Sequence, residues 1–381
     1  MSSDVADLAR PLDAVPDGWR ETTLGIALAK SESGGTPPRD VEAYWNGDIP
    51  WASVKDVVKG EGFAPEETIT AAGLANSTSK LIPAGTNIFA ARMGVGAVVR
   101  YPFPVAINQD LMAFTPSPDL DPGYLFYWLQ ARKAAFVAVA TGTTVKGIRK
   151  DVLLSFPLSL PPLDEQRRIA EVLRSVDEAI AAAQDVVDQS KSNLEAATSK
   201  LMAAHHSLSD WRCGRCDSFF VLQRGFDITE AQATPGPYRV ISSSGPSYSH
   251  SEFAVEGPAV ITGRKGRLGT VFYSEEACWP HDTALWVKDF KGNHPRFVYW
   301  KLRQMDLKAY DAATSVPTLN RNNVHALEIA FPPIAEQIDI SETLDAMLLA
   351  IDRAEAELVA LQGIKSTISI DLLSGRVRVP A

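Results

Sequence analysis

The chain has 381 residues, a hydrophobic content of 45% and a formal net charge of −9. This length suits two or three domains, and this composition supports folded cores. No run of 18 apolar residues occurs, so the sequence predicts no membrane-spanning helix, and the polar residues 1–10 lack the core of a signal peptide. Three cysteines fit a reducing compartment, and we expect a cytoplasmic protein.

The negative charge is unevenly distributed along the chain. Most of it lies in residues 161–210 and 332–381, and the other segments are close to neutral. A strongly acidic chain would argue against binding to nucleic acid, but near-neutral segments can still carry basic faces. The charge therefore leaves DNA binding open.

The first 160 residues predict a mixed α/β domain. Apolar segments of β type flank a glycine-rich turn at 92–96, an aromatic-rich helix follows, and a polar loop at 141–150 precedes the last strand. The predicted strands are Asn87–Ala91, Ala97–Tyr101, Leu111–Phe114 and Val152–Leu160, and the predicted helix is Tyr124–Val139.

A long helix is predicted from Pro161 to about Ala204. The Pro-Pro pair blocks helix before it, and the Asp-Glu-Gln that follows suits the positive N-terminus of a helix. Apolar residues recur every seven positions, with a second series three residues after each, which is typical of a coiled-coil helix. The seven-residue series is Leu173, Ile180, Val187 and Leu194.

The second half of the chain repeats the first, so the sequence predicts a tandem duplication. The glycine-rich stretch 263–273 corresponds to 91–101 and aligns Arg264 with Arg92, and the strand Val324–Phe331 corresponds to Val152–Leu160. Pro-Pro-x-x-Glu-Gln occurs at 161–166 and again at 332–337, where it opens a second long helix that runs to about Ser374.

The second long helix has the same apolar register as the first, which predicts that the two helices pack on each other. Its seven-residue series is Leu344, Ile351 and Leu358, with Lys365 as the one break. Two unrelated amphipathic helices are the alternative. We therefore predict a first domain at 1–160, a first long helix at 161–206, a second domain at 207–331, and a second long helix with a tail at 332–381.

Basic residues gather in and near the two glycine turns. Glycine lets a backbone approach a phosphate closely, and arginine can bind guanine O6 and N7 through two hydrogen bonds. Arg264-Lys265-Gly266-Arg267 places three cations in four residues, which makes a local positive field. Ordinary turns with solvated cations are the alternative. The candidate DNA-contacting residues are Arg92, Lys146, Arg149, Lys150, Arg264, Lys265, Arg267 and Arg321.

Other chemistry is weakly indicated. Cys213-x-x-Cys216 and Cys278-x-x-His281 have the residue types and spacing of zinc ligands, but we favour a buried core cysteine and two incidental ones, with no metal. The chain has no P-loop, no Asn-Pro-Pro-Tyr-type methyltransferase motif and no Glu-x-Lys nuclease core. We expect no catalytic residues and no cofactor.

This order of globule, helix, globule and helix resembles the specificity subunits of type I restriction–modification systems. The resemblance rests on Gly-Gly-Thr-Pro at 34–37, Tyr-Trp-x-Gly-Asp-Ile-Pro-Trp at 44–51, and the repeated Pro-Pro-x-x-Glu-Gln with its heptads. It covers almost the whole chain, although residues 225–229 of the second domain read Gly-Phe-Asp-Ile-Thr instead of Gly-Gly-Thr-Pro.

The resemblance implies an α+β fold, in which two mixed α/β target recognition domains are separated by an antiparallel coiled coil of the two long helices. Each domain would read one half of an asymmetric, bipartite site in double-stranded DNA. Two DNA adenine methyltransferase subunits, and then motor-endonuclease subunits, would assemble on the chain, which would itself be non-catalytic. The alternative is a coiled-coil scaffold with two protein-binding globules that does not touch DNA.

Overall fold

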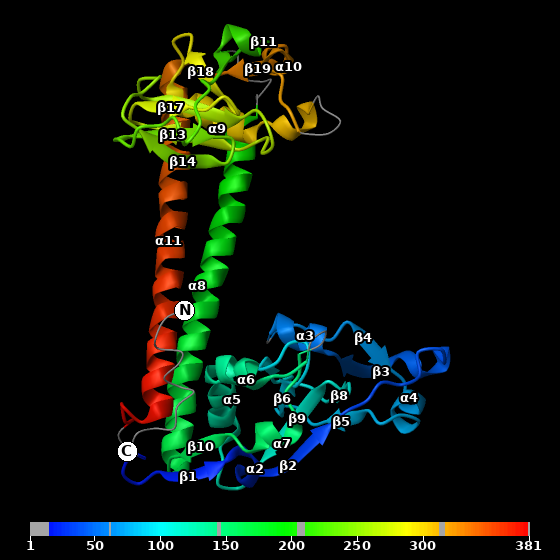
Figure 1. Cartoon of the computed structure of the whole chain (residues 1–381). Helices are drawn as coiled ribbons and strands as arrows, with labels where there is room; N and C mark the ends of the chain where they lie inside the picture. The colour runs from blue at the N-terminus through cyan, green and yellow to red at the C-terminus, as the bar shows by residue number, and fades with distance from the viewer. Residues whose placement is uncertain (1–14, 61, 143–145, 204–209, 312–316, 380–381) are drawn as a thin grey trace. The chain divides into compact units, whose positions relative to one another are not determined.

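The computed structural model of the chain describes residues 15–60, 62–142, 146–203, 210–311 and 317–379. The chain forms two compact units. Unit 1 comprises Met1–Ala182 and Leu358–Ala381, and unit 2 comprises Ala183–Glu357. Each unit therefore combines one mixed α/β domain with a part of each long helix (Figure 1). The domain boundary predicted between residues 206 and 207 lies outside the described residues.

The described residues of unit 1 form three sheets. Their strand orders are β2-β9-β6-β7, β4-β3-β8-β5 and β1-β10. The strands are β1 (Arg20–Thr23), β2 (Leu28–Ser33), β3 (Trp45–Ala52), β4 (Glu67–Ile69), β5 (Lys80–Ile82), β6 (Asn87–Ala90), β7 (Val98–Val99), β8 (Val105–Ile107), β9 (Leu111–Pro116) and β10 (Pro157–Leu160). The short helices are α2 (Leu24–Ala27), η1 (Glu42–Tyr44), α3 (Val54–Lys59), α4 (Ala71–Ala75), α5 (Pro122–Ala131), α6 (Lys133–Val139) and α7 (Lys150–Leu154).

The part of unit 2 that the structure describes also forms three sheets. Their strand orders are β12-β18-β15-β16, β14-β13-β17 and β11-β19. The strands are β11 (Arg212–Arg215), β12 (Val221–Arg224), β13 (Tyr238–Ser242), β14 (Gly245–His250), β15 (Ala259–Gly263), β16 (Val271–Ser274), β17 (Cys278–Pro280), β18 (Ala284–Asp289) and β19 (Glu328–Phe331). The short helices are η2 (Cys216–Ser218), α9 (Pro295–Gln304), η3 (Leu307–Tyr310) and α10 (Arg321–His325).

Among the described residues, the strands of the two units correspond except for β5, which has no counterpart in unit 2, and this agreement confirms the predicted duplication. The antiparallel pair β6–β9 is matched by β15–β18, with Ala90 opposite Leu111 in unit 1 and Gly263 opposite Ala284 in unit 2. In unit 1, β3 pairs in parallel with β8, and this pair is matched by β13 with β17 in unit 2. The predicted fold class of tandem α/β domains with two long helices is also confirmed.

Two of the predicted strands are only partly strands. The stretch Val152–Leu160 is not one strand, because its first part belongs to α7 and only its last part forms β10. The corresponding stretch Val324–Phe331 splits in the same way into the end of α10 and β19. Leu153 and Val324, both fully buried, anchor these short helices in the cores. The apolar residues of each stretch therefore enter the core partly from a short helix and partly from a strand.

In unit 1, the beginning of one long helix packs against the end of the other. The first long helix, α8, spans Leu163–Met202, and the second, α11, spans Ile334–Ser374. Leu173 of α8 is fully buried in one core with Leu372 and Leu373 of α11. Lys365, the break in the apolar series, pairs with Asp177 at 2.5 Å, and Asp177 also accepts a hydrogen bond from the Tyr127 hydroxyl.

In unit 2, the end of α8 packs against the beginning of α11. Leu194 shares a core with Leu344 and Ile351, and Lys191 pairs with Glu355 at 2.6 Å. The two helices therefore run in opposite directions in each unit, as predicted for an antiparallel pair. Of the other residues predicted to lie in the helix seam, Val187 and Leu358 are buried and Ile180 is half-buried.

The motif Pro-Pro-x-x-Glu-Gln fastens each domain to its long helix. The amide of Gln166 is fully buried, donates to the carbonyls of Pro161 and Asp119, and accepts from the Asp121 backbone N–H at the N-cap of α5. Gln337 repeats this arrangement in unit 2. It donates to the Pro332 carbonyl and to the Asn293 side chain, and it accepts from the N–H of His294, the N-cap of α9. We call these two arrangements the helix junctions.

The glutamate of the same motif binds the tryptophan that immediately precedes the first strand of each domain. The Trp19 indole donates to Glu165, and the Trp211 indole donates to Glu336, both at 3.2 Å. In unit 1 the chain end adds a third member, because the Arg378 guanidinium binds Glu165 through two hydrogen bonds of 2.6 and 2.8 Å. This pairing lowers the pKa of the Glu165 carboxyl below its usual range, although burial opposes the shift.

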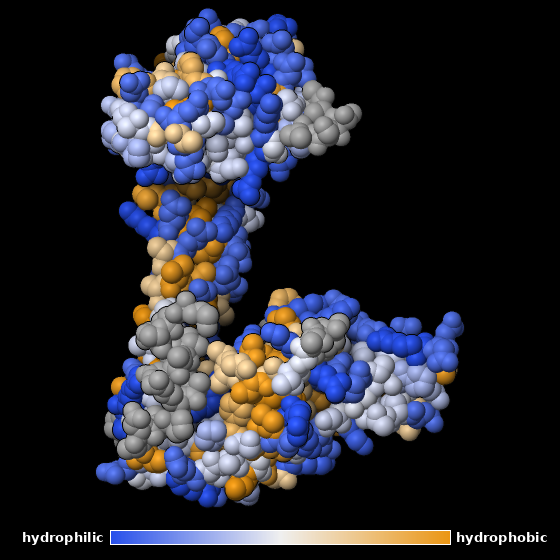
Figure 2. All heavy atoms as spheres, viewed as in Figure 1, coloured by the Kyte–Doolittle hydropathy of each residue, from blue (hydrophilic) through white to orange (hydrophobic). Residues whose placement is uncertain are grey.

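Hydrophobic and hydrophilic residues both lie on the visible surface (Figure 2). Several large apolar side chains of the long helices are exposed: Val186 of α8, and Ile334, Ile338, Leu349, Val359 and Ile364 of α11. Among the described residues, no helix combines the length and the apolar character that crossing a membrane requires.

Candidate nucleic-acid interface

In unit 1, backbone hydrogen bonds join three loops at one edge of the domain. The turn between β6 and β7 is tied to the loop after β8, because the Ala91 N–H donates to the Asp110 carbonyl at 2.8 Å. The same turn is tied to the loop before α7 by two further bonds, Ile148 N–H to the Ala91 carbonyl and Met93 N–H to the Lys146 carbonyl. The turn that carries Arg92 therefore lies beside the loop that carries Lys146.

A fourth loop of unit 1 contains the Gly-Gly-Thr-Pro motif. A Cβ atom on Gly34 would lie 1.8 Å from the Ile107 carbonyl oxygen, so only glycine allows this approach. The Gly35 N–H donates to that carbonyl, and the Thr36 hydroxyl donates to the Gln109 side chain at 2.5 Å. The motif thus positions a loop at the same edge. We define the loop edge of unit 1 as residues 34–36, 91–97, 107–110 and 146–148.

Unit 2 builds the same edge with the same hydrogen bonds. The Arg264 N–H donates to the Thr283 carbonyl, the Leu319 N–H donates to the Arg264 carbonyl, and the Gly266 N–H donates to the Pro317 carbonyl. We define the loop edge of unit 2 as residues 225–227, 264–270, 280–283 and 317–319.

Gly225 has the role of Gly34 in unit 2. A Cβ atom there would lie 2.2 Å from the His281 carbonyl oxygen, and the next residue, Phe226, donates its N–H to the Pro280 carbonyl. The departure of residues 225–229 from Gly-Gly-Thr-Pro therefore leaves the backbone arrangement intact. The first glycine of this loop recurs in unit 2 because a backbone carbonyl again lies too close to allow a side chain.

The predicted equivalence of Arg92 and Arg264 is wrong by one residue. Arg92 forms a β-bridge with Gly147, and the matching bridge in unit 2 joins Lys265 to Thr318. Met93 and Gly266 follow, with φ angles of 57° and 80°. The shift arises because the backbone bonds set the register of the turn, whereas the sequence comparison had matched one arginine with another. Arg264 therefore corresponds to the buried Ala91.

The predicted cations of unit 1 have different surroundings. Arg92 and Lys146 are exposed at the loop edge, and the Arg92 guanidinium is 3.6 Å from the Asp110 carboxylate. Arg149 forms an ion pair with Asp151. The Lys150 ammonium donates to the Ser31 carbonyl at 3.2 Å. The structure therefore brings Arg92 and Lys146 together, and it places Arg149 and Lys150 at the start of α7.

In unit 2, Lys265 and Arg267 are exposed on either side of Gly266. Arg264 is half-buried, and its guanidinium donates to the Asp282 carbonyl at 3.1 Å. Burial, with repulsion from Arg224, lowers the pKa of Arg264. Arg321 is exposed as the first residue of α10. The exposed charge of this turn therefore comes from Lys265 and Arg267.

Sequence reasoning missed the polar pair at the base of each edge. Where unit 1 has Thr36 and Gln109, unit 2 has Asp227 and Asp282, and the Asp282 carboxylate pairs with Arg224 at 2.7 Å. Asp227, Asp282 and His281 offer ligand atoms within 4.8 Å of one another. Both ring nitrogens of His281 are already hydrogen-bonded, to the Ile228 carbonyl and to Thr283. The sequence carried no signal for this pair, because bonds between distant segments set the register of the loops.

The residues weighed as zinc ligands do not converge. Cys216 and Cys278 are buried in two different cores, and Cys213 is exposed. Burial raises the pKa of Cys216 to about 12 and that of Cys278 to about 11, so both thiols stay protonated at neutral pH.

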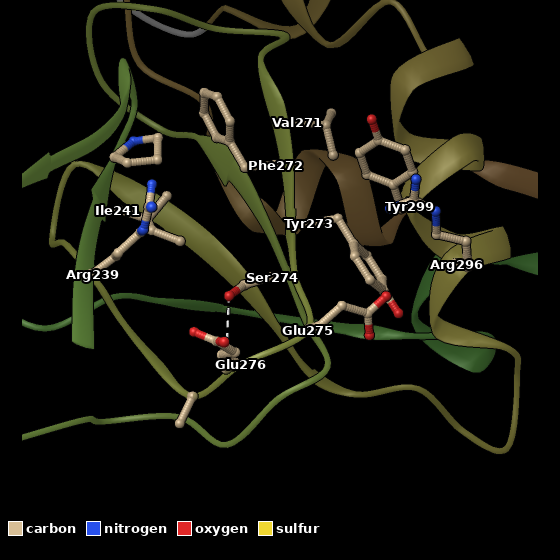
Figure 3. Close-up of a pocket in the computed structure, with 12 residues that line it drawn as sticks. Arg239, Ile241, Val271, Phe272, Tyr273, Ser274, Glu275, Glu276, Arg296 and Tyr299 are labelled. Carbon is tan, nitrogen blue, oxygen red and sulfur yellow. Dashed lines mark hydrogen bonds between the residues drawn. The ribbon is translucent and has the colours of Figure 1, made fainter. Parts of the chain in front are cut away.

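A cavity of about 440 Å³ in unit 2 lies around β16 and the residues after it (Figure 3). The close-up shows Arg296 beside the rings of Tyr273 and Tyr299. The guanidinium carbon of Arg296 lies 4.5 and 4.6 Å from the centres of these two rings, and its Nε donates to the Asp345 carboxylate at 2.8 Å. Arg296 is therefore engaged within the unit, and its polar contacts attach α9 to α11.

A family profile described as "Type I restriction modification DNA specificity domain" matches residues 16–187 and again residues 209–361. The chain is 32% identical over 168 residues to the EcoR124I/EcoR124II specificity subunit of Escherichia coli, and 27% identical over 171 residues to the MjaIX specificity subunit of Methanocaldococcus jannaschii. These alignments cover 42% and 44% of this chain, and 40% and 39% of the relatives.

The fold is similar to solved structures along almost its whole length. A type I restriction–modification S subunit from M. genitalium aligns with a TM-score of 0.63 at 16% identity, over 96% of this chain and 98% of that one. A chain from a study of complex assembly and conformational transition of the type I R-M system aligns with a TM-score of 0.64 at 15% identity, over 96% and 100%. Because the profile matches both halves, the chain belongs to the family of type I restriction–modification DNA specificity domain proteins, with two copies of the domain.

Proposed function

We propose that the chain is the sequence-specific DNA-recognition subunit of a type I restriction–modification complex and has no active site of its own. Each unit would read one half of a bipartite site in double-stranded DNA. The observation that carries this proposal is the loop edge, which is built twice with the same backbone bonds and carries exposed cations each time. Exposed cations attract phosphates, and side chains on a fixed backbone can reach base edges.

The half-sites would differ in sequence. Position by position, unit 1 presents Arg92, Met93 and Gly94 where unit 2 presents Lys265, Gly266 and Arg267. Direct readout depends on which donors, acceptors and methyl groups meet the groove, so different side chains on one backbone select different bases. The composite site is therefore expected to be asymmetric.

The long helices would hold the other subunits. We propose that two DNA adenine methyltransferase subunits, and then motor-endonuclease subunits, assemble on the chain. Apolar side chains are exposed on the helices in both units, including Leu349 in unit 2 and Val359 in unit 1, which are 50% and 67% exposed. Exposed apolar side chains of this kind are available for contacts with other proteins.

Two measurements test the proposed function. Gel shifts with the cognate methyltransferase subunits present should show site-specific binding that weakens steeply as salt rises. Methylation mapping of the host with and without the gene should show the loss of one bipartite motif. Binding without sequence preference, or an unchanged methylome, would favour the scaffold alternative. Methyl transfer by the chain alone would contradict the absence of an active site.

Helix length would determine the spacer between the half-sites. One heptad inserted between Ala182 and Ala183, matched by one between Glu357 and Leu358, leaves the residues of each unit intact. Each insertion adds about 10.5 Å of helix, which corresponds to about three base pairs of DNA. Both half-sequences should survive in the methylation map while the spacer lengthens. An unchanged spacer with full activity would show that the helices do not set it.

A further inference from the structure

The loop edge of unit 1 carries one apolar side chain among its exposed cations. Met93 is 63% exposed and follows the exposed Arg92 at the tip of the turn. Its φ angle of 57° lies in the left-handed region, which a methionine adopts at a cost in free energy and a glycine does not. The corresponding residue of unit 2 is Gly266, so the fold itself does not require a side chain there.

The turn holds Met93 in a defined position. Its N–H donates to the Lys146 carbonyl at 3.0 Å, and the next N–H, from Gly94, donates to the Arg92 carbonyl at 2.6 Å. The backbone after the tip is tied as well, because the Gly96 N–H donates to the Ala90 carbonyl. These bonds fix the backbone on both sides, and the side chain is left in solvent.

A second exposed apolar side chain lies next to this turn. A Cβ atom on Gly94 would lie 2.5 Å from a methyl carbon of Val58, which is itself 58% exposed at the end of α3. Met93 and Val58 thus make the loop edge of unit 1 partly apolar. In unit 2, Lys265 and Arg267 flank Gly266, which has no side chain. The exposed Met93 side chain is therefore available to a partner outside the chain.

We propose that Met93 is a specificity-determining residue that packs on the methyl group of one thymine in the half-site read by unit 1. This inference rests on the proposed function. The thymine C5-methyl is the apolar feature of the major groove, and apolar side chains read it by contact. A side chain that inserts between base steps acts as a single wedge. Met93, in contrast, has the exposed Val58 next to its turn and Arg92 beside it. This arrangement suits a surface that lies against base edges.

The test uses the full chain assembled with its cognate methyltransferase subunits. Competition binding compares duplexes in which each thymine of the mapped site is replaced, one at a time, by uracil, which lacks the methyl group. Wild type should bind about fourfold more weakly at one position of one half-site, the effect expected from one buried methyl group. Met93→Gly should bind both duplexes equally at that position, and Met93→Leu should keep the preference.

The variants distinguish the possible outcomes. Glycine adopts the left-handed backbone without strain, so Met93→Gly is expected to fold and to assemble. Two results would overturn the role of Met93. One is that wild type and Met93→Gly lose the same affinity at every replaced thymine. The other is that the half-site contains no A·T pair. A rise in 2-aminopurine fluorescence that requires Met93 would identify a wedge instead and would also overturn it. A wild-type complex without any sequence preference would refute the proposed function itself.

Discussion

At the two helix junctions the same side chain makes the same two bonds, whereas at the two loop edges the same backbone carries different side chains. Gln166 and Gln337 each donate to the carbonyl of the first proline of their motif and accept from the N-cap N–H of the aromatic-rich helix. Met93 and Gly266 occupy the same backbone position in the two turns but differ in their side chains. A junction has its partner within the chain, so its chemistry recurs. A loop edge is expected to have its partner in DNA, so its chemistry can vary.

The largest effect is expected in the helix pair, which both units share. Leu344→Asp places an unpaired charge at a fully buried position and should lower the free energy of unfolding by several kcal/mol. Leu349→Asp, on the same helix at a position that is 50% exposed, should leave stability nearly unchanged. Denaturant unfolding of the two variants checks this. Equal stability would mean that Leu344 does not pack in the seam.

The next largest effect on stability is expected when the buried glutamine of a helix junction is replaced. Gln337→Ala leaves the His294 N–H and the Asn293 side chain without their buried partner, which should cost about 2–3 kcal/mol. Gln166→Ala should cost a similar amount, because its bonds in unit 1 are equivalent. Gln362→Ala, at an exposed position of α11, is the control. Thermal melting that is unaffected by both junction variants would contradict the role of the motif as a fastening.

Loop-edge substitutions should act on DNA and leave stability unchanged. Lys265→Ala and Arg267→Ala are each expected to lower the slope of log K against log salt by roughly one, because each would remove one of the proposed phosphate contacts. Lys288→Ala removes an exposed charge from β18 of the same unit and should leave the slope unchanged. If all three variants reduce binding equally, only the overall charge matters, and the loop edge is not the contact surface.

The smallest effect concerns a charged group that lies beside only one of the two junctions. Glu165 binds Arg378, and among the residues that the structure describes no arginine pairs with Glu336. Since the pKa of folded Glu165 is lowered, its stabilising effect is complete above the usual carboxyl pKa and is lost as the pH falls through the lowered value. Unfolding measured between neutral and acid pH should therefore depend less on pH in Glu165→Gln. A profile identical to that of wild type would contradict this pairing in solution.

The sequence by itself determined the duplication and the long helices. The repeated Pro-Pro-x-x-Glu-Gln and the seven-residue apolar series predicted α8 and α11 almost to their ends. Both signals are local, because a helix is made from contacts between residues three and four apart. The same sequence pattern indicated the family, and the motif at 34–37 proved to be the loop that only glycine can form against the Ile107 carbonyl.

Only the tertiary structure decided the register of the loop edges and the identity of the segments that lead into the long helices. Arg92 matches Lys265, and not Arg264, because bonds to Gly147 and Thr318, far along the chain, position each turn. Residues 152–160 divide into a helix and a strand because Leu153 is buried against a core assembled from distant segments. Contacts of this kind leave no period in the sequence, so the side chains that face outward could be identified only after the chain had folded around them.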